Sequence, residues 1–155
     1  MRALFTLLAT ILGAAIIFGA REVLGYSKGK SFQLQVASIG NGQVMRPDAA
    51  AAFTAMRAAA AQDGITLTVN YAYRSMEEQE MLYAKYLAGT GSLAAKPGFS
   101  NHQSGVAVDI RVGNTTSSTY RWLANNAFRF GFKRTVASEP WHWEYHGPSD
   151  APKRL

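Results

Sequence analysis

The 155-residue chain contains no cysteine, and this absence removes two kinds of site. Disulfide bonds cannot form, and thiolates cannot hold a metal, so the ligands of any metal must be histidine or carboxylate side chains. The absence does not exclude an exported protein; it only removes one indication of the redox compartment. Histidine is also scarce, with three residues in the whole chain.

Clustered positive charge is missing as well, although the net charge is +6 and the isoelectric point is about 9.8. Such a balance suits nucleic acid, an anionic lipid surface or an anionic cell-wall polymer. However, no stretch of five residues is basic, and neither a zinc-finger pattern nor an aromatic RNP motif occurs. We therefore expect no nucleic-acid partner.

Residues 3–20 carry no charge over 18 positions, close to the lower limit for spanning a bilayer. The run could be a signal peptide or an uncleaved anchor, and a small-residue cleavage motif at 13–15 lies inside it, which favours the anchor. We expect residues 1–24 to form a hydrophobic helix that anchors the chain in the inner, cytoplasmic membrane or directs export. Residues 25–31 then form a linker, and the remainder works in the periplasm or outside the cytoplasm.

The remaining residues, 32–155, are predicted to form one domain. Capping and breaking residues predict helices at 47–62, 76–87 and 117–128. Alternating or β-branched stretches predict strands at 32–36, 65–70, 106–112 and 141–145, with a hairpin turn at Asn41-Gly42 and a loop at 89–101. This mixed order leaves little room for βαβ crossovers. We therefore expect an α+β fold, a small monomeric domain with a mainly antiparallel sheet core flanked by helices.

Two segments hold the residues whose chemistry stands out: SNHQSGVAVDI, with His102 and Asp109, and EPWHWEY, with Glu139 and His142. Two imidazoles and one carboxylate can hold a zinc ion and leave a fourth position for water, whose proton a nearby glutamate can take. His102 is predicted on a loop and Asp109 on a strand, and they converge if the loop folds over the strand. Taken singly, they could equally be a surface histidine and an ordinary polar strand residue.

The second segment is expected to be extended, with Glu139 and His142 facing one cavity and Trp141 and Trp143 excluding water around the histidine. The alternative is an aromatic core strand whose histidine is satisfied by other contacts. His146 could be a further ligand, but an outer-shell or surface role fits better. The role of Glu144, which could orient a ligand, pair with an arginine or be exposed, stays open.

Arg74 lies between a predicted strand and the helix that Ser75 caps. At a strand end its planar cation could reach into a cleft and bind a substrate carboxylate or the oxyanion of a reaction. A solvent-exposed arginine at a helix start is the alternative.

Three segments together, YAYRSMEEQEMLY, KPGFSNHQSGVAVDI and EPWHWEY, resemble the zinc D-alanyl-D-alanine carboxypeptidases and dipeptidases linked to vancomycin resistance, and the related L-alanyl-D-glutamate endopeptidases of phages and bacteria. The resemblance covers about residues 32–147. The motif S-x-H-x-x-G-x-A-x-D is present from Ser100 to Asp109, and E-x-x-H is present at Glu139 and His142. The combination is specific, and the family fold is a small α+β domain.

The resemblance implies a set of roles. One zinc ion is bound by His102, Asp109 and His142, with Glu139 as catalytic base. Arg74 steadies the substrate carbonyl or oxyanion, and Ser100 and Gln79 line the substrate cleft.

The activity implied is hydrolysis of peptidoglycan stem peptides, with removal of the terminal D-alanine as the leading hypothesis. The alternative is an L-alanyl-D-glutamate endopeptidase acting as a membrane-anchored or released phage-type endolysin. A third hypothesis, a zinc-stabilised wall-binding module without activity, is disfavoured because Glu139 and Arg74 are both retained. The sequence does not show phage or bacterial origin.

Overall fold

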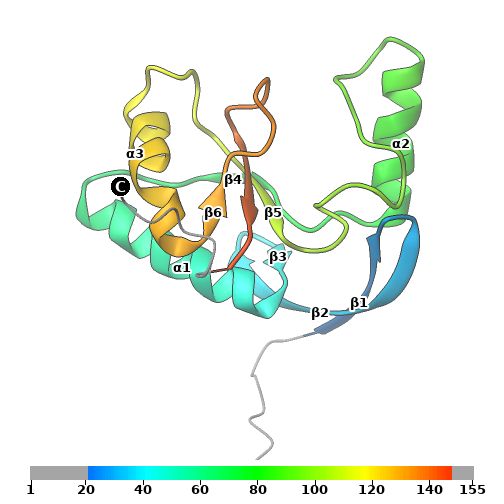
Figure 1. Cartoon of the computed structure of the whole chain (residues 1–155), viewed down its shortest axis with the longest axis horizontal. Coiled ribbons are helices and arrows are strands. Elements are labelled where there is room, and N and C mark those ends of the chain that lie inside the picture. The colour runs from blue at the N-terminus through cyan, green and yellow to red at the C-terminus, as the bar shows by residue number, and fades with distance from the viewer. Residues whose placement is uncertain (1–20, 148–155) are drawn as a thin grey trace, which may run out of the picture.

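The computed structural model of the protein describes residues 21–147, which form two antiparallel sheets and their flanking helices (Figure 1). One sheet has the order β1 (Arg21–Ser27), β2 (Lys30–Gly40), β3 (Gln43–Met45). The other has the order β4 (Val69–Tyr71), β5 (Ala107–Ile110), β7 (His142–Tyr145), β6 (Phe132–Lys133). The helices are α1 (Pro47–Gln62), α2 (Met76–Leu87), α3 (Ser118–Asn126) and the 3₁₀ helix η1 (Ala127–Phe130).

The α+β fold with antiparallel sheets and flanking helices is therefore confirmed. The hydrophobic N-terminal helix expected within residues 1–24 falls almost entirely outside the described residues. Within residues 21–147, no helix combines the length and the apolar character that crossing a bilayer requires.

Local signals fixed two helices and one turn. Pro47 occupies the first turn of α1, where its missing N–H costs no hydrogen bond. Ser75 and Glu78 form a reciprocal capping box at the start of α2. Asn41 and Gly42, both with positive φ, form the two-residue turn between β2 and β3, because such turns match the twist of the strands.

The linker expected at residues 25–31 is wrong, and so is the domain start at 32. Arg21–Ser27 is strand β1, paired along its whole length with β2 from Lys30 to Val36. Lys28 and Gly29 have φ of 51° and 78°, so the Gly/Ser/Lys-rich composition belongs to a tight hairpin turn and its flanks. Within the described residues, the folded domain thus begins at Arg21.

Other predicted elements exist with different bounds. The strand expected at 65–70 is β4, which begins only at Val69. The residue before it, Thr68, accepts one hydrogen bond from the N–H of Arg111, just after β5. The helix expected at 117–128 is α3, capped by Ser117 and continued by η1. Strands β1, β3 and β6 had not been predicted.

The four-stranded sheet divides the domain into a core side and a site side. Val108 and Ile110 of β5 and Trp143 and Tyr145 of β7 belong to the hydrophobic core with α1. Because side chains alternate along a strand, the residues between them point to the other face. Phe53 of α1 is fully buried in this core, edge-on to Phe132 at 6.2 Å.

Helix α2 stands to one side of the body, away from α1 and α3 (Figure 1). Gln79 is its one buried residue, and Met81 and Leu87 are 59% and 67% exposed. Its position is therefore set by its cap and by polar contacts of Gln79 rather than by apolar packing.

Replacing Phe53 by alanine should destabilise the domain by about 3–5 kcal/mol, because it leaves a cavity in a fully packed core. Urea denaturation followed by circular dichroism measures this. Phe99→Ala is the matched control, since Phe99 is 52% exposed. Equal losses for the two variants would contradict the assignment of the core.

Candidate metal centre

Asp109 and His142 are direct cross-strand partners in the register of β5 and β7. Opposed residues of an antiparallel pair share a face and hold their side chains about 5 Å apart. Both side chains are buried, and Asp109 Oδ1 lies 3.0 Å from His142 Nδ1. The seven-residue spacing from His102 to Asp109 therefore reflects a loop that returns to its own strand.

His102 lies on the loop before β5 and is fixed by backbone groups of the segment that follows β4. Its Nδ1 lies 2.7 Å from the Ala72 carbonyl oxygen, and its own carbonyl accepts the N–H of Arg74. A hydrogen bond from Nδ1–H to a carbonyl leaves the lone pair of Nε2 free to face a metal. Nε2 indeed faces the carboxylate of Asp109 at 3.3 Å.

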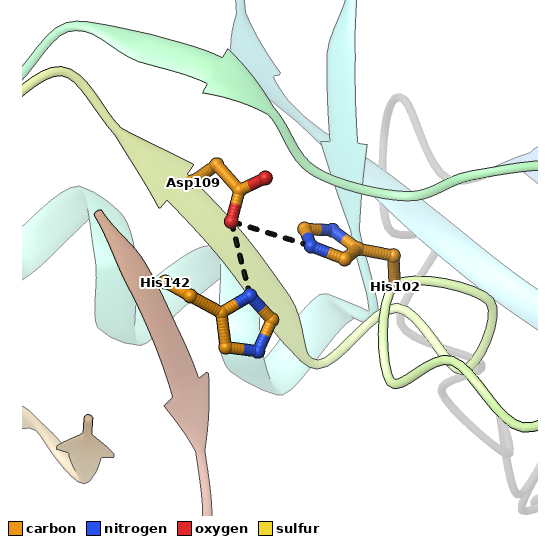
Figure 2. A group of neighbouring side chains, drawn as sticks. All are labelled: His102, Asp109 and His142. Carbon is orange, nitrogen blue, oxygen red and sulfur yellow. Dashed lines mark hydrogen bonds and ion pairs between the residues drawn. The ribbon is translucent and has the colours of Figure 1, made fainter. Parts of the chain in front are cut away.

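The three predicted ligands converge: one ligand atom from each of His102, Asp109 and His142 lies within 4.8 Å of the others (Figure 2). A tetrahedral zinc site with bonds of about 2.0–2.2 Å separates its ligand atoms by about 3.3 Å. The distances of 3.3 Å and 3.0 Å from Asp109 Oδ1 to the two imidazole nitrogens match that separation. The donor set and its spacing therefore fit a zinc ion.

Glu144 contacts the ring nitrogen of His142 that faces away from Asp109, which settles its role among the alternatives that the sequence left open. Its Oε1 lies 2.9 Å from His142 Nε2 and accepts a hydrogen bond of 2.8 Å from the Asn101 amide. His146 is not part of the ligand cluster; its Nε2 lies 3.5 Å from Glu144 Oε2. An outer carboxylate of this kind fixes the orientation and tautomer of a metal-binding imidazole.

Each ring nitrogen of His142 faces a carboxylate, and these contacts shift the pKa values of the site. Burial favours the neutral ring, but hydrogen bonds with Asp109 and Glu144 outweigh it and raise the pKa of His142 to about 9. Burial likewise opposes ionisation of Glu144, yet His142 and Asn101 hold its pKa down at about 2. The pKa of Asp109 is also far below its usual value, because two histidines outweigh its burial. This face therefore attracts a cation.

Glu139 lies beside the ligands without joining them. Its Oε2 is 4.0 Å from His142 Nδ1, and its side chain is 23% exposed. Residues 139–142 form a turn, in which the N–H of His142 bonds to the Glu139 carbonyl, and the expected extended chain begins only with β7 at His142. The turn brings both side chains to the same side and leaves the carboxylate of Glu139 accessible from solvent.

Arg74 brings a positive charge close to the carboxylate of Asp109. One of its terminal nitrogens lies 4.0 Å from Asp109 Oδ2 and the other donates to Gln79 Oε1 at 2.9 Å. Its guanidinium lies 5.9 Å from the centre of the Tyr71 ring. Burial lowers the pKa of Arg74, opposed by the charge of Asp109. The exposed surface arginine considered from the sequence is thereby excluded.

Gln79 does not line a cleft as the resemblance had implied. Its side chain is fully buried, its oxygen accepts from Arg74 and its nitrogen donates to the Ala95 carbonyl at 2.7 Å. With both ends of the amide engaged, Gln79 positions Arg74 instead of offering groups to a ligand. Ser100 is buried at the start of the turn that carries His102, where its carbonyl accepts the N–H of Gln103.

The two tryptophans do not shield the ligands as expected. Trp143 is 4% exposed and belongs to the core on the opposite face of β7, with its indole N–H donated to the Pro140 carbonyl. Trp141 is 39% exposed. Adjacent strand residues point to opposite faces, so Trp143 lies on the other face of β7 from His142.

Replacing Glu144 by glutamine should weaken zinc binding about 10–100-fold, because the carboxylate that orients His142 loses its charge. Competition against a chromophoric chelator measures the affinity. Glu80→Gln on the exposed side of α2 is the control. An unchanged affinity in Glu144→Gln would show that this contact does not support the ligand.

Chelator-treated protein should lose stability as the pH rises from about 6.5 to about 9. The folded state raises the pKa of His142 to about 9 from 6.5, so this contribution is complete below the lower value and lost as pH passes the upper one. Zinc affinity should change oppositely and rise with pH, because binding displaces the proton. Urea titrations of chelator-treated protein at several pH values test the first statement, with His142→Ala as the reference that lacks the group. Zinc competition titrations of the parent chain at the same pH values test the second.

Comparison with known proteins agrees with this geometry. Residues 42–148 match the sequence profile of the family described as VanY, D-alanyl-D-alanine carboxypeptidase. A D-alanyl-D-alanine carboxypeptidase of Enterococcus faecalis is 38% identical over 122 residues, which cover 61% of this chain and 46% of that protein. The chain spans about half the length of the curated relatives it matches.

Two solved structures extend the comparison. The vancomycin resistance D,D-pentapeptidase VanY, solved as a mutant with Zn(II), has a TM-score of 0.64 and 30% identity, over 76% of this chain and 82% of that chain. VanYB in complex with D-alanine-D-alanine has the same TM-score and identity, over 77% and 81%. The family profile covers well over half of the chain, and its matched region contains all three clustered ligands. The chain therefore belongs to the VanY family of D-alanyl-D-alanine carboxypeptidases.

Proposed function

We propose that the protein is a zinc-dependent carboxypeptidase that removes the terminal D-alanine from peptidoglycan stem peptides. The observation that carries the proposal is the convergence of His102, Asp109 and His142 on one sheet face, with Glu139 beside His142 and Arg74 beside Asp109. Membership of the VanY family and the ligands named for the two VanY structures, Zn(II) and D-alanine-D-alanine, support the metal and the substrate class.

His102 Nε2, Asp109 Oδ1 and His142 Nδ1 are the atoms that would hold the zinc ion, given their mutual distances. Bound zinc in such a site lowers the pKa of a water molecule toward neutrality and polarises a carbonyl group. With these three side chains as its ligands, a bound zinc ion would keep room for a water molecule.

Glu139 is suited to accept the proton of the attacking water and to return it to the leaving amine. A general base needs to lie close to the reacting water without being tied to the metal. The carboxylate of Glu139 is 4.0 Å from a ligand nitrogen and remains partly accessible, which satisfies both conditions. The same carboxyl group, once protonated, is then the proton donor for the amine of D-alanine.

Arg74 is suited to bind the oxygen on which negative charge develops, or the terminal carboxylate of the peptide. Its guanidinium is held by Gln79 and lies near the ring of Tyr71, so little side-chain freedom remains to be lost on binding. A guanidinium that binds the terminal carboxylate requires a free chain end, whereas one that binds the oxyanion serves exopeptidase and endopeptidase cleavage alike.

We infer the cellular setting from the sequence alone. We place the domain outside the cytoplasm, held at the inner membrane by the uncharged residues 3–20 and acting as a monomer. An endolysin role is the competing setting, and the position of peptide cleavage separates the two.

Glu139→Gln should retain zinc but lose at least about 100-fold of its hydrolytic rate, the usual share of a general base. His142→Ala should lose both zinc and activity. Metal analysis and the rate of D-alanine release measure the two properties, with Glu80→Gln as the control on exposed α2. Most of the activity remaining in Glu139→Gln would contradict its role as base.

Mass spectrometry of stem peptides incubated with the full chain in detergent tests the substrate. Loss of one alanine from a pentapeptide ending in D-alanyl-D-alanine supports the proposal. A cut between L-alanine and D-glutamate would overturn it in favour of the endopeptidase. A cut confined to the tetrapeptide would keep the enzyme class but correct the bond that is cleaved.

A further inference from the structure

We propose that the hairpin of β1 and β2 braces the loop that carries His102, and that zinc affinity depends on the backbone N–H of Tyr26. The loop in question, residues 98–106, is called the His102 loop below. The effect on zinc rests on the proposed metal site, whereas the effect on the loop itself does not.

The hairpin lies outside the region by which the family is defined. The family match begins at residue 42, after the end of β2, whereas β1 and β2 occupy residues 21–40. The match contains the ligands but not this support. The hairpin therefore lies outside the family match, although it contacts the loop that carries one of the predicted ligands.

The outer edge of β1 is directed at the metal centre. β1 pairs with β2 on one side, and on its other side the N–H of Tyr26 donates to the Gln103 carbonyl at 3.0 Å. The Leu24 carbonyl, two residues earlier on the same edge, accepts the hydroxyl of Tyr73 at 2.9 Å. Tyr73 lies between Ala72 and Arg74, the two residues whose backbone groups bond to His102.

Gln103, the neighbour of His102, passes this contact on to the rest of the loop. Its side chain is fully buried, accepts the Gly98 N–H at 2.7 Å and contacts the sulfur of Met76 at 3.6 Å. Its own N–H bonds to the Ser100 carbonyl. Gln103 thus links Gly98 and Ser100, the residues before His102, to Tyr26 of β1.

The tip and the body of the hairpin touch the loop at two more points. At the tip, Gly29 donates to the Gly98 carbonyl at 2.9 Å, and a Cβ on Gly98 would lie 3.1 Å from the Gly29 Cα. Lower down, a Cβ on Gly105 would lie 3.2 Å from the Leu34 side chain. Gly98 and Gly105 have positive φ, so both the backbone shape and the close approach favour glycine.

These contacts matter because His102 is the only one of the three clustered ligands that no strand positions. Asp109 and His142 are fixed by sheet register, whereas a loop ligand depends on whatever holds the loop. Outer contacts that orient a ligand commonly change metal affinity by about 10–100-fold when removed. For His102, the contacts of the hairpin with the loop are the outer contacts that orient the ligand.

Tyr26→Pro tests the brace selectively, because proline removes an N–H that faces away from β2 and is tolerated at such edge positions. Tyr26→Ala is the matched control, since it loses the side chain but keeps the N–H. Hydrogen exchange of the 98–106 amides in chelator-treated protein reports on the loop. Zinc competition titration, with the absorption spectrum of the cobalt-substituted protein, reports on the site.

Relative to Tyr26→Ala, we expect Tyr26→Pro to exchange these amides about three- to tenfold faster, the effect of one lost hydrogen bond, and to bind zinc more weakly by a comparable factor. Equal exchange and equal affinity in the two variants would overturn the proposal. If Tyr26→Pro does not fold, Tyr73→Phe removes the parallel bond to Leu24, and unchanged exchange in that variant would overturn it as well.

The outcomes separate this proposal from the proposed function. A parent chain that binds no zinc would contradict the metal site, while the exchange comparison would still decide on the brace. A chain that binds zinc, shows the brace and releases no D-alanine would contradict the activity alone.

Discussion

The metal centre depends on the backbone register of β5 against β7. That register places Asp109 opposite His142 and Ala107 opposite Glu144 on one face of the sheet. Two strands thereby supply the carboxylate, one imidazole and the group that orients it. The remaining ligand needs only a loop that reaches the same face, and the carbonyl of Ala72, just after β4, accepts the hydrogen bond of its Nδ1. The chemistry is thus assembled on hydrogen bonds of the sheet rather than on long side chains.

The three ligands and the two catalytic candidates could be named from the sequence because their motifs are local and chemically restrictive. Helices α1 and α2 were equally accessible, since Pro47 and the capping box at Ser75 act within one turn. The sequence predicted that His102 meets Asp109 only if the loop folds over the strand, because no local signal specifies that fold. In the structure, long-range hydrogen bonds hold the loop over the strand.

What the sequence did not reveal is decided by partners distant in the chain. β1 is a strand because β2 and Gln103 occupy both of its edges, yet its own composition suggests a linker. Glu144 orients His142 because alternation along β7 returns it to the same face, a signal that the pattern His-x-Glu did contain. Gln79 was expected to contact substrate, but its side chain is buried and supports Arg74 instead.

The alternation along β7 also determines where the chain tolerates insertions and deletions. A shift of one residue there would exchange the two faces, bringing Trp143 to the metal side and His142 into the core. Lengthening the exposed loop at 88–93 would disturb no such assignment. In descendants of this sequence, gaps should therefore accumulate beyond α2 and be absent from β5 and β7, so that evolutionary freedom in the length of the protein lies on one side of the metal centre.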